Sequence, residues 1–460
     1  MPTALLTQTD TLLALEELAA GARHELILAF RSFDPETPLH SARLRELGLV
    51  TWSDLIPWLT RRGVHLHMAF GDDDPLLDPE RHRRAWLAAS GFANVAQGDA
   101  QILCAPHGQT AGAVWRWRFI RPRRRRMAAL KAAPPEHLTI LQRQSLEQKM
   151  PLRTQHVHHA FAVADGEEVV IGGFTLDEHR PASLWQDVAL RLSDADFAGA
   201  LRAHFADCWT AAIQTGAPTL ATPPQPFRSV ARRLSRPERR LLRTLSDPKT
   251  GPFRISGTPR EQSFETHICR LLSDARQHVY IETAALRHRP YADALIAAAK
   301  AAPELQLVVV FHPAGDRLPL GGALRETRER GQALQTEQLQ RLSKAFGSRA
   351  AFVEHHLPGD LTADGAAPLP GRLIIVDGTY AVVGSHDLTA RAAKFDSQAS
   401  ILIRDPAFAG DLMGKRSAMW LGQGRDVTRA ASWANATAPL RPLAVKPGRM
   451  VPARIPDDLF

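Results

Sequence analysis

Three histidines stand within four positions, at His156, His158 and His159. Imidazole titrates near neutral pH and serves as a nucleophile, a proton carrier or a metal ligand. If the segment is a strand, His156 and His158 point to one face and His159 points to the other. The group is therefore either a metal site or one functional histidine with two incidental neighbours. The second interpretation is favoured, and no metal is expected.

The segment that follows these histidines occurs twice in the chain. In each copy, an apolar run of strand character ends in Asp-Gly, and a second apolar run ends in Gly-Gly or Gly-Ser. Asp-Gly between two such runs is the strongest short signal for a β-hairpin. Asp165 precedes Gly172 by seven residues, and Asp377 precedes Gly384 by seven. Matching hairpins 212 residues apart (165 to 377) indicate a duplicated domain.

The elements around each hairpin also repeat, in the order strand, helix, strand, long insertion, hairpin, strand and helix. Before the first hairpin they are expected at 22–35, 52–63 and 64–75; before the second they are expected at 275–290, 291–303 and 305–313. This alternation predicts an α/β fold with two similar half-domains, each a mixed sheet flanked by helices.

Shifts in amino-acid composition along the chain predict the boundaries of the two halves, the linker and the tail. Residues 1–214 form an N-terminal half with a basic insertion at about 75–150, and residues 261–425 form a C-terminal half. The Pro-, Arg- and Ser-rich stretch 215–260 is predicted to be a linker with one basic helix, and the Pro- and Ala-rich tail 426–460 to pack loosely. The densest basic run, from 115 to 131, is either a solvated face or a rim for an anionic substrate or membrane.

Charge and cysteine usage narrow the class of protein. With 57 basic and 48 acidic residues, the formal net charge is +9, which favours phosphate-rich partners such as lipid headgroups or nucleic acid. The three cysteines are widely spaced and predict neither a disulfide framework nor a metal-ligand group. No signal peptide or membrane-spanning run is evident, so a cytoplasmic location is expected. Peripheral contact with the inner membrane and export by a route without an amino-terminal signal stay open.

Together, these segments resemble the phospholipase D superfamily, in its bacterial transphosphatidylase or cardiolipin-synthase-like branch. That family carries H-x-K-x4-D, followed about seven residues later by Gly-Gly or Gly-Ser. Further segments similar to the family's pattern are RRGVHLHMAFGDDDP, LWQDVALRL with HFADCW, HVYIETAALR and DSQASILIRDP. The resemblance covers about residues 10–425.

The resemblance implies two half-sites that face each other across a pseudo-twofold axis. In the family, one His attacks phosphorus and the other protonates the leaving alcohol. Two Lys bind the phosphate oxygens, and the Asp residues hold the imidazoles. No metal or other cofactor is required.

Both motifs depart from the family's pattern, and they do so differently. The first keeps His158, as nucleophile or acid, and Asp165, but has Ala160 in the place of the Lys. The second keeps Asp377 but has Pro370 in the place of the His, and Pro can neither attack phosphorus nor carry a proton. Arg372 takes the place of the second Lys, where its guanidinium is expected to bind phosphate.

The turns after the motifs supply the remaining candidates. The resemblance implies phosphate-binding roles for Gly172, Gly173, Gly384 and Ser385. Asp387 stands where the family has Asn, and Gln398 where it has Glu. His386 is a candidate substitute acid, and the positions of His355 and His356 cannot be fixed from the sequence.

Two kinds of function follow. In the first, the fold binds a phosphodiester or phospholipid headgroup between its halves, and its catalysis is weakened or lost because a nucleophile and acid act as a unit. In the alternative, it is an active phospholipase D or transphosphatidylase that works through a phosphohistidine at His158. A nuclease of the same superfamily is less favoured, so nucleic acid is the weaker partner hypothesis. Asp165 and Asp377 also have a simpler explanation as turn-forming residues.

Overall fold

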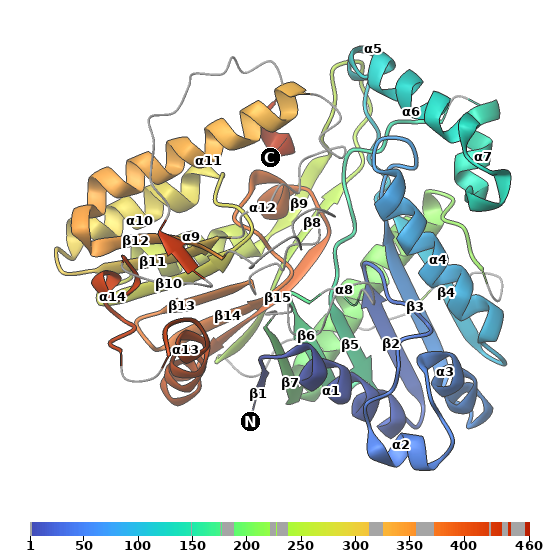
Figure 1. Ribbon diagram of the computed structural model, residues 1–460, viewed down its shortest axis with the longest axis horizontal. Coiled ribbons are helices and arrows are strands. Elements are labelled where there is room, and N and C mark those ends of the chain that lie inside the picture. Colours follow the sequence, from blue (N-terminus) through green and yellow to red (C-terminus); the bar gives the residue numbers. More distant parts are fainter. Residues whose placement is uncertain are drawn as a thin grey trace.

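The computed structural model describes residues 2–148, 150–174, 176, 188–220, 227, 238–311, 325–355, 372–422, 425–434, 440–442 and 456–460. Two mixed β-sheets stand side by side, the N-terminal one on the right in Figure 1 and the C-terminal one on the left. Pro370 and His356 lie outside the described residues.

The N-terminal sheet has the strand order β1-β7-β6-β5-β2-β3-β4. Its strands are β1 (Thr3–Leu5), β2 (Glu25–Phe30), β3 (His65–Asp72), β4 (Ala100–Pro106), β5 (Phe161–Ala164), β6 (Glu168–Gly172) and β7 (Ala189–Ser193). Its helices are α1 (Gln8–Gly21), α2 (Ala42–Glu46), α3 (Trp52–Arg61), α4 (Pro79–Val95), α5 (Ala113–Arg118), α6 (Ile120–Ala132), α7 (Ile140–Glu147) and α8 (Ala195–Gln214).

The C-terminal sheet repeats this order and adds a strand at each edge, as β9-β8-β15-β14-β13-β10-β11-β12-β16. Its strands are β8 (Arg239–Asp247), β9 (Thr258–Gln262), β10 (His278–Thr283), β11 (Gln306–Phe311), β12 (Ala350–His355), β13 (Leu373–Val376), β14 (Tyr380–Gly384), β15 (Gln398–Arg404) and β16 (Leu440–Pro442). Its helices are α9 (Ser263–Ser273), α10 (Arg289–Ala301), α11 (Arg325–Phe346), α12 (Ala390–Lys394), α13 (Pro406–Leu421) and α14 (Ala430–Ala434).

The duplication predicted from the hairpins is therefore confirmed strand for strand. In each sheet, the first strand after the opening helix (β2 or β10) pairs in parallel with the next strand and antiparallel with the hairpin. Both hairpins turn through Asp-Gly with positive φ, at Asp165 (52°) and Gly166 (66°) and at Asp377 (52°) and Gly378 (58°). Two consecutive residues with positive φ are the signature of a type I′ turn, which matches the twist of the strands.

The two sheets share one hydrophobic core. In β2, Ile27 and Ala29 face this inner core, whereas the alternate residues Leu26 and Leu28 face the outer helices, as strand periodicity requires. Side chains from β11, β13 and β15 join the same inner core, as do residues of α8 and α13. Separate outer cores lie beneath α1, α3 and α4 in the first half and beneath α9, α10 and α11 in the second.

The predicted linker 215–260 is corrected by the structure. Its described residues contain no helix, and β8 pairs with β15 as an integral strand of the second sheet. Since β1 holds the equivalent place beside β7, the second half begins at β8 and not at residue 261. The sequence RRLLRTLSD of Arg239–Asp247 concealed this strand, because it lacks a strict alternation of apolar and polar residues and its polar residues outnumber its leucines.

Two other boundary predictions also change. The insertion expected at about 75–150 includes β4, which is buried and pairs with β3, so only the segment after β4 is an addition to the sheet. The tail packs more closely than predicted: Trp433 lies in the shared core, β16 pairs with β12, and Phe460 is buried.

Candidate functional site

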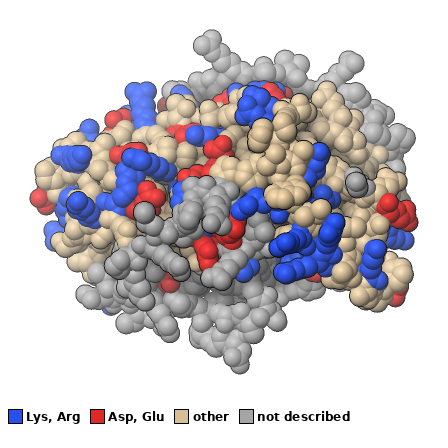
Figure 2. All heavy atoms as spheres, turned by 90° about the horizontal axis from the view of Figure 1, so that it is seen from above, with Lys and Arg blue, Asp and Glu red and all other residues tan. Residues whose placement is uncertain are grey.

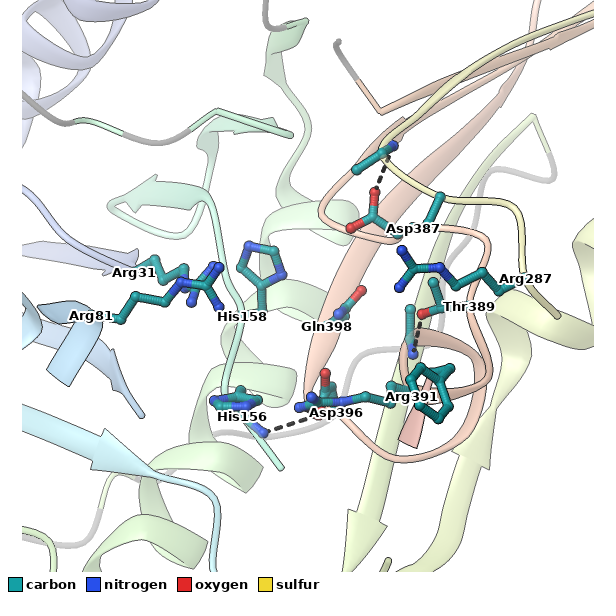
Figure 3. Close-up of a pocket in the computed structure, with 14 residues that line it drawn as sticks. Arg31, Arg81, His156, His158, Arg287, Asp387, Thr389, Arg391, Asp396 and Gln398 are labelled. Atoms are coloured by element: carbon teal, nitrogen blue, oxygen red, sulfur yellow. Dashed lines mark hydrogen bonds and ion pairs between the residues drawn. The ribbon is translucent and has the colours of Figure 1, made fainter. Parts of the chain in front are cut away.

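A pocket opens between the two halves near the carboxyl ends of β2 and β10 (Figure 3). Its volume is about 60 Å³, and both halves line it. The N-terminal half contributes Arg31, Arg81, His156 and His158. The C-terminal half contributes Ala284, Ala285, Arg287, Asp387, Thr389, Arg391, Ala392, Asp396, Gln398 and Phe460.

His158 is held at this interface by backbone pairing between the halves. The His158 N–H donates to the Ser397 carbonyl oxygen at 2.8 Å, and the Ser397 N–H donates to the His156 carbonyl oxygen at 3.0 Å. The His156 N–H donates to Asp396 Oδ1 at 3.0 Å. The segment before β5 thus continues as a short parallel bridge onto the other half, which places His158 in the pocket.

The predicted orientation of the three histidines is confirmed. His156 and His158 line the pocket, whereas His159 turns into the protein interior against His204 of α8. His156 also forms an ion pair with Asp73, which follows β3.

Two arginines of the N-terminal half stand behind His158, each fixed by a carboxylate. Arg31, directly after β2, pairs with Asp73 at 3.0 Å, and Arg81 of α4 pairs with Asp78 at 3.0 Å. Burial opposes the charge of Arg31, but Asp73 outweighs it and raises the pKa of this guanidinium above its usual value. Burial and the nearby charge of Arg31 lower the pKa of Arg81. Two cations are therefore held close together at one wall of the pocket.

The carboxyl groups around the pocket differ in their pKa: burial raises the pKa of Asp78 above its usual value, whereas the pKa values of Asp73 and Asp396 are lowered. Burial alone would raise the pKa of Asp73, but His156 and Arg31 overcome it and hold that pKa well below its usual range. Burial also acts to raise the pKa of Asp396, but Arg391 and His156 outweigh burial and bring this pKa below its usual value.

The opposite wall carries Arg391, whose guanidinium pairs with Asp396 at 2.9 Å. Two buried polar atoms on this wall, Arg391 Nε and Gln398 Oε1, have no hydrogen-bond partner among the described residues. One is a donor and the other an acceptor, so the wall offers complementary contacts to a ligand that carries both an anionic oxygen and a hydroxyl.

The motif aspartates were expected to hold the imidazoles, and this expectation is wrong. Asp165 accepts hydrogen bonds from the backbone N–H groups of residues 23–25, at 2.8–3.0 Å. Asp377 does the same with residues 276–278, at 2.7–3.0 Å. Both lie at the turn end of their hairpins, at the opposite end of β5 and β13 from the pocket, and each fixes the start of the adjoining strand. Their role is structural.

The predicted phosphate-binding turns serve strand packing instead. A Cβ on Gly172 would lie 2.6 Å from the Val188 carbonyl oxygen, and one on Gly384 would lie 2.1 Å from Ser400 Oγ. A Cβ on Gly173 would meet the backbone of the other half, at 3.0 Å from the Gly384 carbonyl oxygen. The Ser385 hydroxyl and N–H both bond to Ala399. None of these four predicted residues lines the pocket.

Arg372 and His386 are also placed differently from the prediction. Arg372 is buried and bridges the halves, with Nη1 donating to the Gly173 carbonyl oxygen at 2.7 Å and Nε to Asp387 Oδ1 at 3.0 Å. It therefore does not line the pocket, although it orients Asp387, which does. Ala160, in the place of the first Lys, lies in the outer core.

His386 is not available as a substitute acid. Its ring stacks on Phe264 at 3.9 Å and bonds to Ser400 and Thr244 at 2.7 and 3.2 Å. Burial, followed by the charge of Arg372, holds the pKa of His386 well below its usual range. The ring is consequently a neutral part of the second half's interior.

One group of described residues has metal-ligand chemistry: His159, His204 and Cys208, with ligand atoms within 4.8 Å of one another. Burial lowers the pKa of His159 to about 3 and raises that of the Cys208 thiol to about 12. The two Nε2 atoms are 3.0 Å apart, a hydrogen bond that neutral rings form unaided. His204 Nδ1 is buried without a partner, whereas a ligating imidazole normally donates its other N–H to a carboxylate or carbonyl. The arrangement fits a packed neutral pair better than a metal centre.

Sequence reasoning missed the pocket arginines. Arg31 and Arg287 follow β2 and β10, and ligands in open α/β sheets bind beyond the carboxyl ends of strands. That rule could have singled out both residues. Arg81 and Arg391 have no comparable signal, because only the folded chain brings α4 and α12 to the same pocket.

No family model and no curated protein matches the chain. Among solved structures, it is similar to phosphatidylserine synthase from Haemophilus influenzae Rd KW20, with 11% identity and a TM-score of 0.54, over 96% of this chain and 87% of that one. The chain has a phospholipase D-like fold.

Two further solved structures match with lower TM-scores. Polyphosphate kinase from Porphyromonas gingivalis gives 10% identity and a TM-score of 0.43, over 91% of this chain and 47% of that one. NucT from Helicobacter pylori gives 13% identity and a TM-score of 0.28, over 39% and 94%.

Proposed function

We propose that this phospholipase D-like chain binds the phosphate group of a phosphodiester or phospholipid headgroup in the pocket between its halves, with catalysis weakened or absent. One observation carries the proposal: Arg31, Arg81, Arg287 and Arg391 converge with His158 on one pocket. Guanidinium groups offer several N–H donors in a planar arrangement that matches phosphate oxygens.

The carboxylates around the pocket support binding by orientation. Asp73, Asp78 and Asp396 each hold one arginine in place, so that the donors are arranged before a ligand arrives. These acids also balance the local charge, so affinity rests on directed hydrogen bonds more than on net attraction. A phosphate ligand in the pocket would supply hydrogen-bond partners for Arg391 Nε and Gln398 Oε1, which have none among the described residues.

Weak catalysis is expected because the second motif contributes neither a proton donor nor a cation to the pocket. Neither Arg372 nor His386 lines the pocket, and Pro370 has no proton to give. The usual pairing of a nucleophile on one half with an acid on the other is thereby lost, and such losses cost several orders of magnitude in rate.

Calorimetric titration with inorganic phosphate and with bis(p-nitrophenyl) phosphate tests the proposal. Arg391→Gln is expected to weaken binding at least about tenfold, the order of one charge-assisted hydrogen bond. Arg270→Gln is the matched control, because Arg270 is 84% exposed and does not line the pocket. Thermal unfolding without ligand separates a binding defect from a folding defect. Equal affinity in a folded Arg391→Gln variant contradicts the proposal.

Residual phosphodiesterase activity is the second candidate, favoured by two imidazoles in one pocket. A ring nitrogen of His158 attacks phosphorus, the bond to the leaving alkoxide breaks, and His156, which lies against Asp73, gives that oxygen a proton. Water then gives a proton to His156 and attacks phosphorus, which breaks the P–N bond, releases the phosphomonoester and restores both imidazoles. In extended backbone, Cα atoms two residues apart are roughly 7 Å apart, a spacing that can admit a phosphate between the two side chains.

Hydrolysis of a fluorescent phospholipid and of bis(p-nitrophenyl) phosphate distinguishes the candidates. Turnover that disappears in both His158→Ala and His156→Gln establishes the two-imidazole reaction. Binding without turnover leaves the first proposal standing alone, and turnover unaffected by His158→Ala refers the activity to another site or protein.

A further inference from the structure

An exposed basic surface lies at α5 and α6, outside the pocket. Residues 113–132 contain eight Lys or Arg residues and no Asp or Glu. Side chains exposed on these helices include Arg116, Arg121, Arg124, Arg125 and Arg126. Figure 2 views the molecule from the side on which these helices lie and shows basic side chains on its right-hand part, as well as others at its left-hand end.

Large apolar side chains are exposed among these arginines. On α5 and at the start of α6, Trp117 is 73% exposed, Val114 39% and Ile120 38%. The loop that contains Phe253, itself 74% exposed, docks beside α5. There the Val114 N–H donates to the Pro252 carbonyl oxygen at 3.0 Å, and Trp115 Nε1 to that of Phe253 at 2.8 Å. We call this the basic–aromatic face: Val114, Trp117, Ile120 and Phe253 with the five exposed arginines.

Folding does not account for the exposed side chains of this face. Trp115 packs against the cluster of Ile255, Leu334 and Phe460, and Phe119 is fully buried. These two residues fix the helices to the body of the protein. Trp117 and Ile120 therefore project from a rigid base, and their exposure costs solubility without a return in packing.

We propose that the basic–aromatic face docks onto an anionic phospholipid bilayer. Arginines are attracted to anionic headgroups, and Trp and Phe settle at the depth of the headgroup boundary. Nucleic acid would also attract the arginines, but exposed Val114 and Ile120 gain nothing from a phosphate backbone, whereas both gain from acyl chains. The combination of aliphatic, aromatic and basic side chains selects the membrane.

The face lies beside the pocket. Phe460 both lines the pocket and belongs to the cluster on which Trp115 packs. A bilayer bound at α5 therefore lies close to the pocket, although the docking requires nothing of the pocket's ligand. Within the described residues, no helix has the length and apolar character needed to cross a bilayer, so contact through this face would be peripheral.

Co-sedimentation of the full chain with vesicles tests the inference. Phosphatidylcholine vesicles with and without about 30% phosphatidylglycerol are compared at low and high salt, since surface attraction is screened by salt. We expect binding to the anionic vesicles only, weakened at least tenfold by the double variant Trp117→Ser/Phe253→Ser. Leu87→Ser is the matched control, because Leu87 is 54% exposed but lies on α4.

A second variant addresses the charges. The triple variant Arg124→Gln/Arg125→Gln/Arg126→Gln is expected to lose at least tenfold in vesicle binding, whereas Arg270→Gln/Arg289→Gln keeps it. Unchanged binding by the apolar double variant and the arginine triple variant overturns the inference. Binding to duplex DNA in preference to vesicles, lost in the triple variant, also overturns it and makes the face a nucleic-acid surface. Phosphate titration of the same variants reports the pocket separately.

Discussion

The two halves of this chain are built on one strand order, yet only one of them brings its motif imidazole to the pocket. In both, an Asp-Gly turn bonds the start of the neighbouring strand. In both, an Asp caps the last long helix, with Asp194 accepting from Phe197 and Asp405 from Phe408. The features that the two halves share are therefore those that satisfy backbone hydrogen bonds at turns and helix starts.

The halves differ in the motif side chains that take no part in these backbone hydrogen bonds. The first half directs His156 and His158 into the pocket, while the second uses Arg372 to join the halves and His386 to fill its interior. The two halves can therefore keep the same fold although residues at equivalent motif positions line the pocket in one half and pack in the interior of the other.

The largest expected effect on stability concerns a buried ion pair that is present in the second half and absent at the equivalent positions of the first. In the second half, Glu282 forms a fully buried ion pair with Arg416, with Nη2 and Oε2 2.7 Å apart. The equivalent residues of the first half, Ala29 on β2 and Phe205 on α8, are apolar and lie in the shared core. Glu282→Ala leaves a buried cation alone and is expected to cost about 3–5 kcal/mol of unfolding free energy. Urea denaturation measures it.

The double variant Glu282→Ala/Arg416→Phe copies the first half and completes this test. Replacing a buried pair by apolar residues is often neutral, so more than half of the lost stability should return. A double variant less stable than Glu282→Ala would show that the halves cannot exchange these residues.

The next effect in size tests whether the motif aspartates are equivalent. Asp165→Ala and Asp377→Ala each remove the acceptor of three backbone N–H groups and leave Ala at a positive φ. Each is expected to lose about 2–3 kcal/mol of stability and to leave phosphate affinity unchanged. Chemical denaturation and calorimetric titration measure the two quantities. A catalytic or binding role for either residue would appear as a loss of affinity in a variant that remains folded.

The dependence of stability on pH below neutrality gives a further test of the structural role of Asp165. Burial acts to raise the pKa of Asp165, but the N–H groups of Glu25, His24 and Arg23 prevail and bring it below the ordinary 3.8. A carboxyl whose folded pKa is depressed stabilises the fold above about pH 4, and this contribution is lost as the pH falls through the lowered value. The Tm difference between the wild type and Asp165→Asn should therefore hold from about pH 7 to 4 and shrink below. A difference that already shrinks near pH 6 would point to another group.

The smallest effect is expected at His386, whose equivalent in the first half is Phe174. His386→Phe keeps the stacking on Phe264 and loses two hydrogen bonds, at a cost of about 1–2 kcal/mol. Phosphate affinity and any hydrolysis should be unchanged. A loss of hydrolysis in this variant, with the Tm preserved to within a few degrees, would restore His386 as an acid.

The sequence predicted the parts of this molecule that local rules determine. Asp-Gly turns, strand periodicity and the repeat gave both hairpins, both sheets and the opposite faces of His158 and His159. It did not predict β8, because an Arg-rich strand near an edge reads as a linker. It also misplaced Arg372, since whether a guanidinium reaches a ligand or the Gly173 carbonyl oxygen depends on how the halves meet.

The shared inner core has a thermodynamic consequence. Side chains of Ile27 and Ile375, from different halves, belong to one packed cluster, and residues 156–158 pair with the other half through their backbone. Neither half can unfold without exposing the inner face of its twin. Heating should therefore produce a single transition with equal calorimetric and van't Hoff enthalpies, as for a one-domain protein.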